Sequence, residues 1–111
     1  LIEFLTVYSL VWPGMSSMIQ LKQPKPTQNF CDSVVNVMTI RWDGTVVPCC
    51  YDLTTIMPLG NLLEEELEDI WNNERYGKLR EDIASFEPPK LCQGCVVLYP
   101  QNYMTKKDIQ L

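Results

Sequence analysis

The residues WDGTVVPCCYD, numbers 42–52, join a tight-turn signal to an apolar run that ends in two adjacent cysteines. Asp43-Gly44 is a strong two-residue hairpin signal, and the residues on either side of it are rich in β-branched side chains. This pattern predicts two antiparallel strands over residues 33–51. Because a hairpin returns the chain to where it began, we expect Cys31 to lie beside Cys49 and Cys50.

The two adjacent cysteines cannot share one direction on a regular strand. Successive side chains of a strand point to opposite faces, so only one of Cys49 and Cys50 faces a common site unless the strand breaks there. Pro48 has no N–H group, which suits an edge position or the end of a strand just before these cysteines.

Helix signals follow the hairpin in residues 59–89. Apolar side chains recur at helical intervals in two groups, Leu67, Ile70 and Trp71, and then Tyr76, Leu79 and Ile83. They predict two short helices, or one helix kinked at Asn72-Asn73, each with a buried stripe. The acidic run Glu64 to Glu66 is placed in the first helical turn, where it complements the helix dipole. Pro88-Pro89 ends the helix and leads the chain to Cys92.

Composition excludes several classes of function. The 111 residues suffice for one modest core, and a net charge of −5 argues against a nucleic-acid surface, which needs clustered Lys and Arg. No run approaches the roughly 18 apolar residues that span a bilayer, so we expect no membrane insertion and a cytoplasmic location. The sequence contains no histidine, so a transition-metal site would have to rely on thiolates.

The five cysteines form a ligand pattern. An odd number of cysteines fits a disulfide scaffold poorly, because one thiol would be left over. Cys31 and Cys49 can be grouped with Cys92-Gln-Gly-Cys95, whose C-x-x-C turn can direct two sulfurs at one ion or cluster. A redox dithiol of the thioredoxin type is the alternative for C-x-x-C, but that motif lies between a strand and a helix start, and this one follows a helix.

The spacing and three phrases of the sequence resemble a known family. Cys31, Gly44, Cys49 and Cys92-x-x-Cys95, together with WDGTVVPCCYD, LGN and LEDIWNNERYGKLR, look like the auxiliary-cluster module of radical S-adenosylmethionine (radical SAM) enzymes. This module is the SPASM domain or its shortened relative, the twitch domain, and the resemblance covers roughly residues 29–96. It implies a 4Fe-4S cluster held by Cys31, Cys49, Cys92 and Cys95. Cys50 lies outside the shared spacing.

Two departures from the family limit what this chain should do. No cysteine follows Cys95, so at most one cluster is expected. The C-x-x-x-C-x-x-C motif that binds the catalytic cluster and S-adenosylmethionine in the family is absent, so the chain should not be catalytic alone. The resemblance implies an upstream catalytic domain, which would bind S-adenosylmethionine, and a peptide or small-molecule substrate as a further partner. The chain begins at Leu1, and residues 1–28 are expected to be a linker and the tail of that upstream barrel.

The sequence therefore predicts a small α+β domain over residues 29–111, with an antiparallel hairpin and one or two short helices around a four-cysteine site. Four thiolates would saturate one iron each, which favours electron transfer over direct ligation of substrate, with substrate binding as the second role. Two alternatives stay open: a structural four-cysteine zinc-binding module that mediates protein interaction, and a metal-free module with buried cysteines. Zinc is also an expected substitute in aerobically prepared protein.

Overall fold

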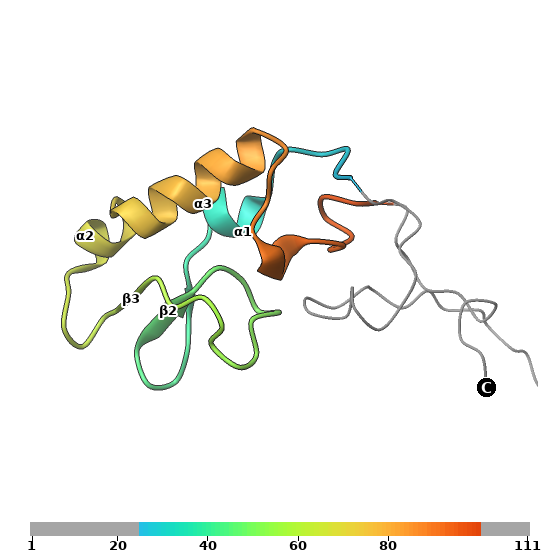
Figure 1. The fold of residues 1–111 in the computed structure, drawn as a ribbon. Helices are drawn as coiled ribbons and strands as arrows, with labels where there is room; N and C mark the ends of the chain where they lie inside the picture. The colour runs from blue at the N-terminus through green and yellow to red at the C-terminus, as the bar shows by residue number, and fades with distance from the viewer. Residues whose placement is uncertain (1–24, 101–111) are drawn as a thin grey trace, which may run out of the picture.

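The fold is known from a computed structural model that describes residues 25–100 (Figure 1). Its elements are α1 (Asp32–Val35), β1 (Thr39–Ile40), β2 (Thr45–Val47), β3 (Gly60–Asn61), α2 (Leu67–Trp71), α3 (Glu74–Ala84) and the 3₁₀ turn η2 (Lys90–Cys92). Figure 1 shows α2 and α3 running along one side of the small sheet, and η2 is the orange-red turn below α1 in this view. The predicted α+β class is therefore confirmed. The expected tail of an upstream barrel, residues 1–20, lies outside the described residues.

The predicted hairpin forms around Asp43-Gly44. β1 and β2 are antiparallel, with Thr39 opposite Val47 and Ile40 opposite Val46. Gly44 has a φ of +87°, a left-handed conformation that glycine adopts without steric cost.

The hairpin is shorter than the predicted range of residues 33–51. The prediction of a strand from residue 33 was wrong, because residues 32–35 form the helical turn α1. The carbonyl of Cys31 accepts hydrogen bonds from the amides of Val34 and Val35, and Val34 is buried in the core. At the other end β2 stops at Val47, directly before Pro48, which cannot donate to a ladder.

A third strand was not predicted. β3 pairs antiparallel with β2, placing Gly60 opposite Val46 and Asn61 opposite Thr45. A Cβ on Gly60 would lie 2.9 Å from the side chain of Ile70, so only glycine lets α2 pack this closely on the strand. The Asn61 side chain accepts a hydrogen bond from the Leu63 amide at 2.8 Å and turns the chain towards α2.

The helical segment divides into two helices at the predicted Asn72-Asn73 break. Asn73 is the N-cap of α3: its side chain accepts a hydrogen bond from the Tyr76 amide at 2.9 Å and donates one to the Leu59 carbonyl at 2.7 Å. The break therefore begins one helix and ties it to the sheet. The predicted stripe of Tyr76, Leu79 and Ile83 is buried, as is Ile70.

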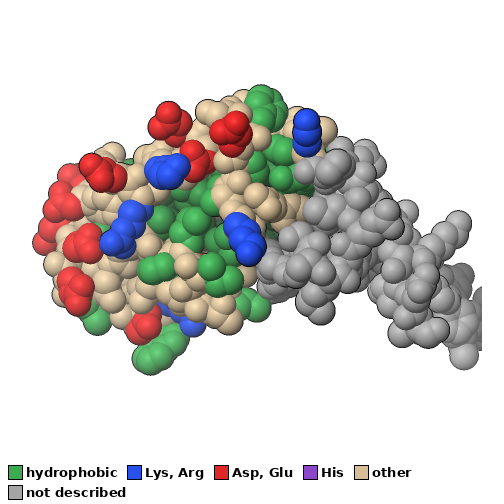
Figure 2. All heavy atoms as spheres, viewed as in Figure 1, with side chains coloured by type: hydrophobic (Ala, Val, Ile, Leu, Met, Phe, Trp, Pro, Cys, Tyr) green, Lys and Arg blue, Asp and Glu red, His purple; other side chains and the backbone are tan. Residues whose placement is uncertain are grey.

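Two predictions about α2 were wrong. Leu67 is 52% exposed, because in a helix of only five residues the face that carries Ile70 is the one turned towards the core. The acidic run Glu64 to Glu66 precedes the helix, with Glu66 as N-cap, and Glu68 and Asp69 occupy the first turn instead. Figure 2 shows acidic side chains gathered at the α2 end of the molecule.

One hydrophobic core joins the sheet to the helices. Its buried members are Val34, Val46, Leu59, Ile70, Tyr76, Leu79, Ile83, Leu98 and Tyr99, and Cys31 and Cys92 pack against it. The cysteine-bearing segments are thus anchored to the same core as α3. Within residues 25–100, no helix has the length and apolar character needed to cross a membrane.

Candidate metal centre

Three separate segments carry the cysteines of the candidate site. Cys31 is the N-cap of α1, Cys49 follows Pro48 just beyond the end of β2, and Cys92 closes η2. Cys95 lies one turn further along the chain, where its amide donates a hydrogen bond to the Cys92 carbonyl at 3.2 Å. All five cysteines of the chain are free thiols.

The thiol of Cys92 has a strongly raised pKa. The value is about 12, chiefly because of burial, and Cys49, Cys95, Cys31 and Asp52 add smaller repulsive contributions. The cysteines that the sequence grouped therefore act electrostatically on Cys92, and their role as ligands of one site stays a prediction.

Cys49 and Cys50 differ in their surroundings although they are adjacent. Cys49 is half-buried, its sulfur accepts a hydrogen bond from the Tyr51 amide and its carbonyl accepts one from the Asp52 amide at 3.2 Å, whereas Cys50 is exposed. Burial is nevertheless the larger effect and raises the pKa of the Cys49 thiol. Because β2 has already ended at Val47, the different surroundings of Cys49 and Cys50 come from a turn and not from the alternation of side chains along a strand. Cys50 still acts electrostatically on Cys49 and Cys95, so it lies at the margin of the site.

The C-x-x-C segment is a compact turn held by its own backbone. The Cys95 carbonyl accepts hydrogen bonds from the amides of Leu98 and Tyr99, and the Cys95 sulfur accepts one from the Val97 amide. Burial still raises the pKa of the Cys95 thiol. Gly94 has a φ of +82°, which lets the turn form, and its amide donates to the buried Tyr99 hydroxyl. The Val97 amide is thus already directed towards the Cys95 sulfur, as in protein sites that tune a metal through N–H···S bonds.

Asp52 is a site residue that sequence reasoning missed. Its side chain is 2% exposed, and its two carboxylate oxygens accept hydrogen bonds from the amides of Ile56 and Met57 at 2.7 and 2.9 Å. These bonds close the loop that follows the cysteine pair, and the Arg41 side chain holds the same loop through the Leu53 carbonyl at 2.8 Å. The sequence did contain a signal for this role, because an aspartate at the start of a loop can accept hydrogen bonds from backbone amides a few residues later.

The donor set fits a thiolate-bound metal or cluster. Cys92, Cys49 and Cys95 have raised pKa values because they are buried beside one another, and the charges that act on them come from other thiols and from Asp52. A bound cation would supply the positive charge that such a set lacks and would hold the thiols as thiolates. In residues 25–100 no three histidine, cysteine or acidic side chains already stand in a metal-binding arrangement.

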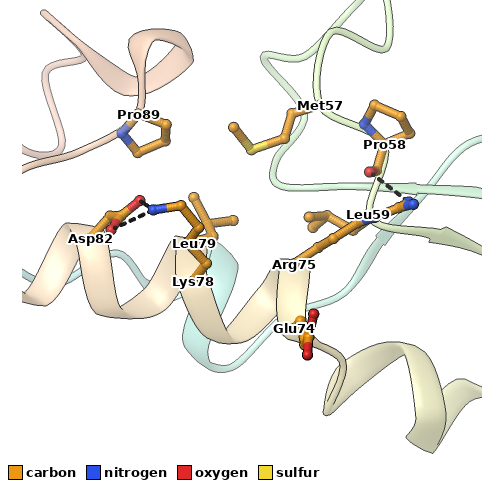
Figure 3. A pocket seen from close by; sticks show the side chains of 9 residues that line it. All are labelled: Met57, Pro58, Leu59, Glu74, Arg75, Lys78, Leu79, Asp82 and Pro89. Carbon is orange, nitrogen blue, oxygen red and sulfur yellow. Dashed lines mark hydrogen bonds and ion pairs between the residues drawn. The ribbon is translucent and has the colours of Figure 1, made fainter.

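A separate groove lies on the α3 side of the molecule (Figure 3). It has a volume of about 370 Å³ and is lined by Met57, Pro58, Leu59, Glu74, Arg75, Lys78, Leu79, Asp82 and Pro89. Figure 3 shows the Lys78–Asp82 ion pair, 3.0 Å between its atoms, at the rim beside Pro89. Because no cysteine lines it, the groove is distinct from the candidate metal centre.

Comparisons with known proteins bear on this site directly. The SPASM family model, described as an iron-sulfur cluster-binding domain, matches residues 31–96, a range that encloses all five cysteines. No solved structure matches the chain significantly.

Two curated proteins are similar to this chain, and the name of one includes dependence on S-adenosyl-L-methionine. The chain is 33% identical over 97 residues to a tungsten-containing aldehyde ferredoxin oxidoreductase cofactor-modifying protein of Pyrococcus furiosus, covering 75% of this chain and 27% of that protein. It is 31% identical over 62 residues to an S-adenosyl-L-methionine-dependent 2-deoxy-scyllo-inosamine dehydrogenase of Niallia circulans, covering 54% of this chain and 25% of that enzyme. The chain thus spans about a quarter of the length of these relatives.

Proposed function

Since this chain belongs to the SPASM family of iron-sulfur cluster-binding domains, we propose that it holds one 4Fe-4S cluster through Cys31, Cys49, Cys92 and Cys95. The observation that carries the proposal is the match of the family model to residues 31–96, which enclose these four cysteines, and the packing of Cys31 and Cys92 against the same core supports it. The bound cluster would supply one-electron redox chemistry. The residues of this chain would ligate it, direct amides at the Cys49 and Cys95 sulfurs and exclude water with the surrounding core.

We propose electron transfer as the role of the site within a larger radical SAM enzyme. Four protein thiolates leave no iron open to a substrate ligand, which favours outer-sphere electron exchange over direct binding. The relatives support a catalytic domain elsewhere in the polypeptide, because this chain matches only about a quarter of each. S-adenosylmethionine would bind in that domain. Reduced thiols and an iron-sulfur cluster suit the cytoplasm, where thiols are kept reduced.

Substrate contact is a second candidate role, favoured by the groove along α3. Its volume of about 370 Å³ falls in the range of small-ligand sites, and its floor is mainly apolar with charged side chains at the rim. A peptide or small-molecule substrate held there would contact this domain without touching the cysteines.

Anaerobic reconstitution tests the cluster assignment. We expect a brown protein that binds about four irons and about four sulfides per chain, the content of one 4Fe-4S cluster. Iron and acid-labile sulfide are measured against protein concentration, and the electron paramagnetic resonance spectrum of the reduced protein identifies the cluster type. Stoichiometric zinc without sulfide, after anaerobic expression with ample iron, would contradict the proposal and favour a structural zinc site with four cysteine ligands.

A further inference from the structure

Arg80 of α3 binds the C-terminal ends of two other helices at once. Its Nε donates a hydrogen bond to the Val34 carbonyl of α1 at 2.9 Å, and its Nη1 donates one to the Trp71 carbonyl at the end of α2 at 2.8 Å. The last carbonyls of a helix have no partner within the helix and carry partial negative charge, so a guanidinium is a favourable cap for them. One side chain therefore satisfies two helix ends that come from distant parts of the sequence.

Two aromatic rings hold the guanidinium in this position. Its central carbon lies 4.3 Å from the centroid of the Trp71 ring and 4.5 Å from that of the Tyr76 ring, while the two rings are 5.2 Å apart. The faces of aromatic rings attract a cation, and Tyr76 is fully buried and cannot move aside. The third nitrogen, Nη2, is buried without a hydrogen-bond partner in the described part of the chain. The arginine is thus fixed by the rings and the two carbonyls.

The contact between Arg80 and Val34 affects Cys31 because a single helical turn connects Val34 to Cys31. α1 has only four residues and begins directly after Cys31. The Cys31 carbonyl accepts hydrogen bonds from the amides of Val34 and Val35. A helix this short does not form without tertiary contacts, because the conformational entropy lost on nucleation exceeds the stabilisation from the hydrogen bonds of one turn. The Cys31 side chain forms no cap on α1, so its thiol remains available to the site. The orientation of Cys31 therefore depends on what holds α1.

We propose that Arg80 is a positioning residue of the cysteine site, holding α1 so that the Cys31 thiol faces the thiols of Cys92 and Cys95. The inference rests on the proposed function, because it takes Cys31 as a ligand. Lysine cannot take over this role: an ammonium group is a point charge, and it lacks the planar fork that reaches two carbonyls while in contact with two rings.

The thiols of the cluster-free, reduced full-length protein provide the test. Trypsin cleaves after Lys22, Arg41, Arg75 and Lys90 but not between Lys25 and Pro26, so it releases Cys31, the Cys49–Cys50 pair and the Cys92–Cys95 pair in three different peptides. Mass spectrometry after timed reaction with iodoacetamide then gives a separate alkylation rate for each peptide. The variants are Arg80→Lys and Arg80→Met. Arg75→Met is the matched control, because Arg75 lies on the same helix and makes only a 3.5 Å contact with the Pro58 carbonyl.

In Arg80→Lys we expect alkylation of Cys31 to accelerate about tenfold relative to the Cys92 and Cys95 peptide, the factor that loss of one charge-assisted hydrogen bond produces. Arg80→Met should show at least the same selectivity, and Arg75→Met none. After reconstitution, Arg80→Lys should bind less iron than the wild type or show altered resonance spectra.

Equal acceleration in all three peptides, or none in Cys31, would overturn the inference, since a purely structural arginine would loosen every segment alike. If Arg80→Met does not fold, Arg80→Lys decides the question. The alkylation ratio needs no cluster, so a wild-type protein that binds no iron would contradict the proposed function while the role of Arg80 is still judged by the ratio.

Discussion

At the scale of single residues, neighbouring side chains of the same type have different surroundings. Cys49 is half-buried with the Tyr51 amide directed at its sulfur, and Cys50, next along the chain, is exposed. The difference arises because Pro48 ends the strand and Asp52 closes the following loop, which turns one thiol inward and the next outward.

This asymmetry predicts opposite results for two serine substitutions. Cys49→Ser removes a proposed ligand whose sulfur already accepts a hydrogen bond from the Tyr51 amide, so we expect it to abolish cluster binding. Cys50→Ser should leave most of the iron and sulfide content unchanged, because its thiol lies at the margin. Iron analysis after reconstitution measures both. Retention of the cluster in Cys49→Ser together with its loss in Cys50→Ser would show that the loop turns the other way.

At the scale of elements, small contacts decide how the sheet and helices fit. β3 is only two residues long, and it lies against α2 because Gly60 has no side chain where Ile70 packs. Asn73 then connects the start of α3 to the Leu59 carbonyl, so both helices are attached to the same short strand.

Alanine at two glycines should therefore change the free energy of unfolding in opposite directions. Gly60→Ala places a Cβ 2.9 Å from Ile70, and overpacking of this kind costs about 1–3 kcal/mol. Gly77→Ala in α3 meets nothing within 4 Å and should stabilise the helix by about 0.5–1 kcal/mol. Denaturant unfolding measures both changes. Equal stability of Gly60→Ala and the wild type would mean that α2 does not pack on β3 as described.

At the scale of the whole molecule, one core supports α3 and the cysteine segments together. Tyr76, Leu79 and Ile83 of α3 meet Leu98 and Tyr99 from the chain beyond the C-x-x-C turn. The cysteine segments also contribute buried side chains, among them Val34 and Val46, but their helices and strands are only two to four residues long. We therefore expect these segments to depend more on a cross-link than the eleven-residue α3 does.

Alkaline pH should destabilise the metal-free protein. The pKa of Cys92 is raised to about 12 from an ordinary value of 9.0, chiefly by burial, and those of Cys49 and Cys95 are raised for the same reason. The folded chain then keeps protons that the unfolded chain releases, so this stability is complete below the unfolded pKa of 9.0 and is lost as pH rises towards 12.

The denaturant concentration at the unfolding midpoint should accordingly decrease as the pH is raised from about 8 to about 10, an interval in which the tyrosines have not yet titrated. Cys92→Ser removes the most strongly shifted group and should show a shallower fall across the same interval. An identical pH dependence in Cys92→Ser and the wild type would contradict the burial of this thiol.

Removal of the metal should loosen the molecule unevenly. Thiolate ligation of the order of 10 kcal/mol is comparable to the whole stability of a small domain, so the segments it joins should open first. In metal-free, reduced protein we expect hydrogen-exchange protection to fall in residues 31–51 and 90–97, while the helices in residues 67–84 stay partly protected by their core contacts. Unchanged protection in the first two ranges would favour buried cysteines without a structural metal.

Local sequence rules predicted those parts of the fold that depend on near neighbours. Asp43-Gly44 predicted the hairpin, Asn72-Asn73 marked the break between helices, and the spacing of Tyr76, Leu79 and Ile83 identified the buried face of α3. The predicted two-residue turn was wrong: the Arg41 amide donates to the Thr45 carbonyl at 2.8 Å, so residues 42–44 form the loop, and of these only Gly44 has a positive φ. The grouping of four cysteines also came from the sequence, because their spacing is specific enough to resemble a family whose model matches residues 31–96.

Contacts between distant residues decided the rest. Val34 and Val35 are β-branched and favour a strand, yet residues 32–35 form α1. Val34 enters the core, and its carbonyl is capped by Arg80 from 46 positions away. β3 exists because Gly60 meets both Val46 and Ile70, a coincidence that no local pattern contains. Sequence periodicity reports which face of a segment is apolar. The tertiary structure alone determines what lies against that face, because packing and the capping of helix ends depend on atoms that meet only once the chain has folded.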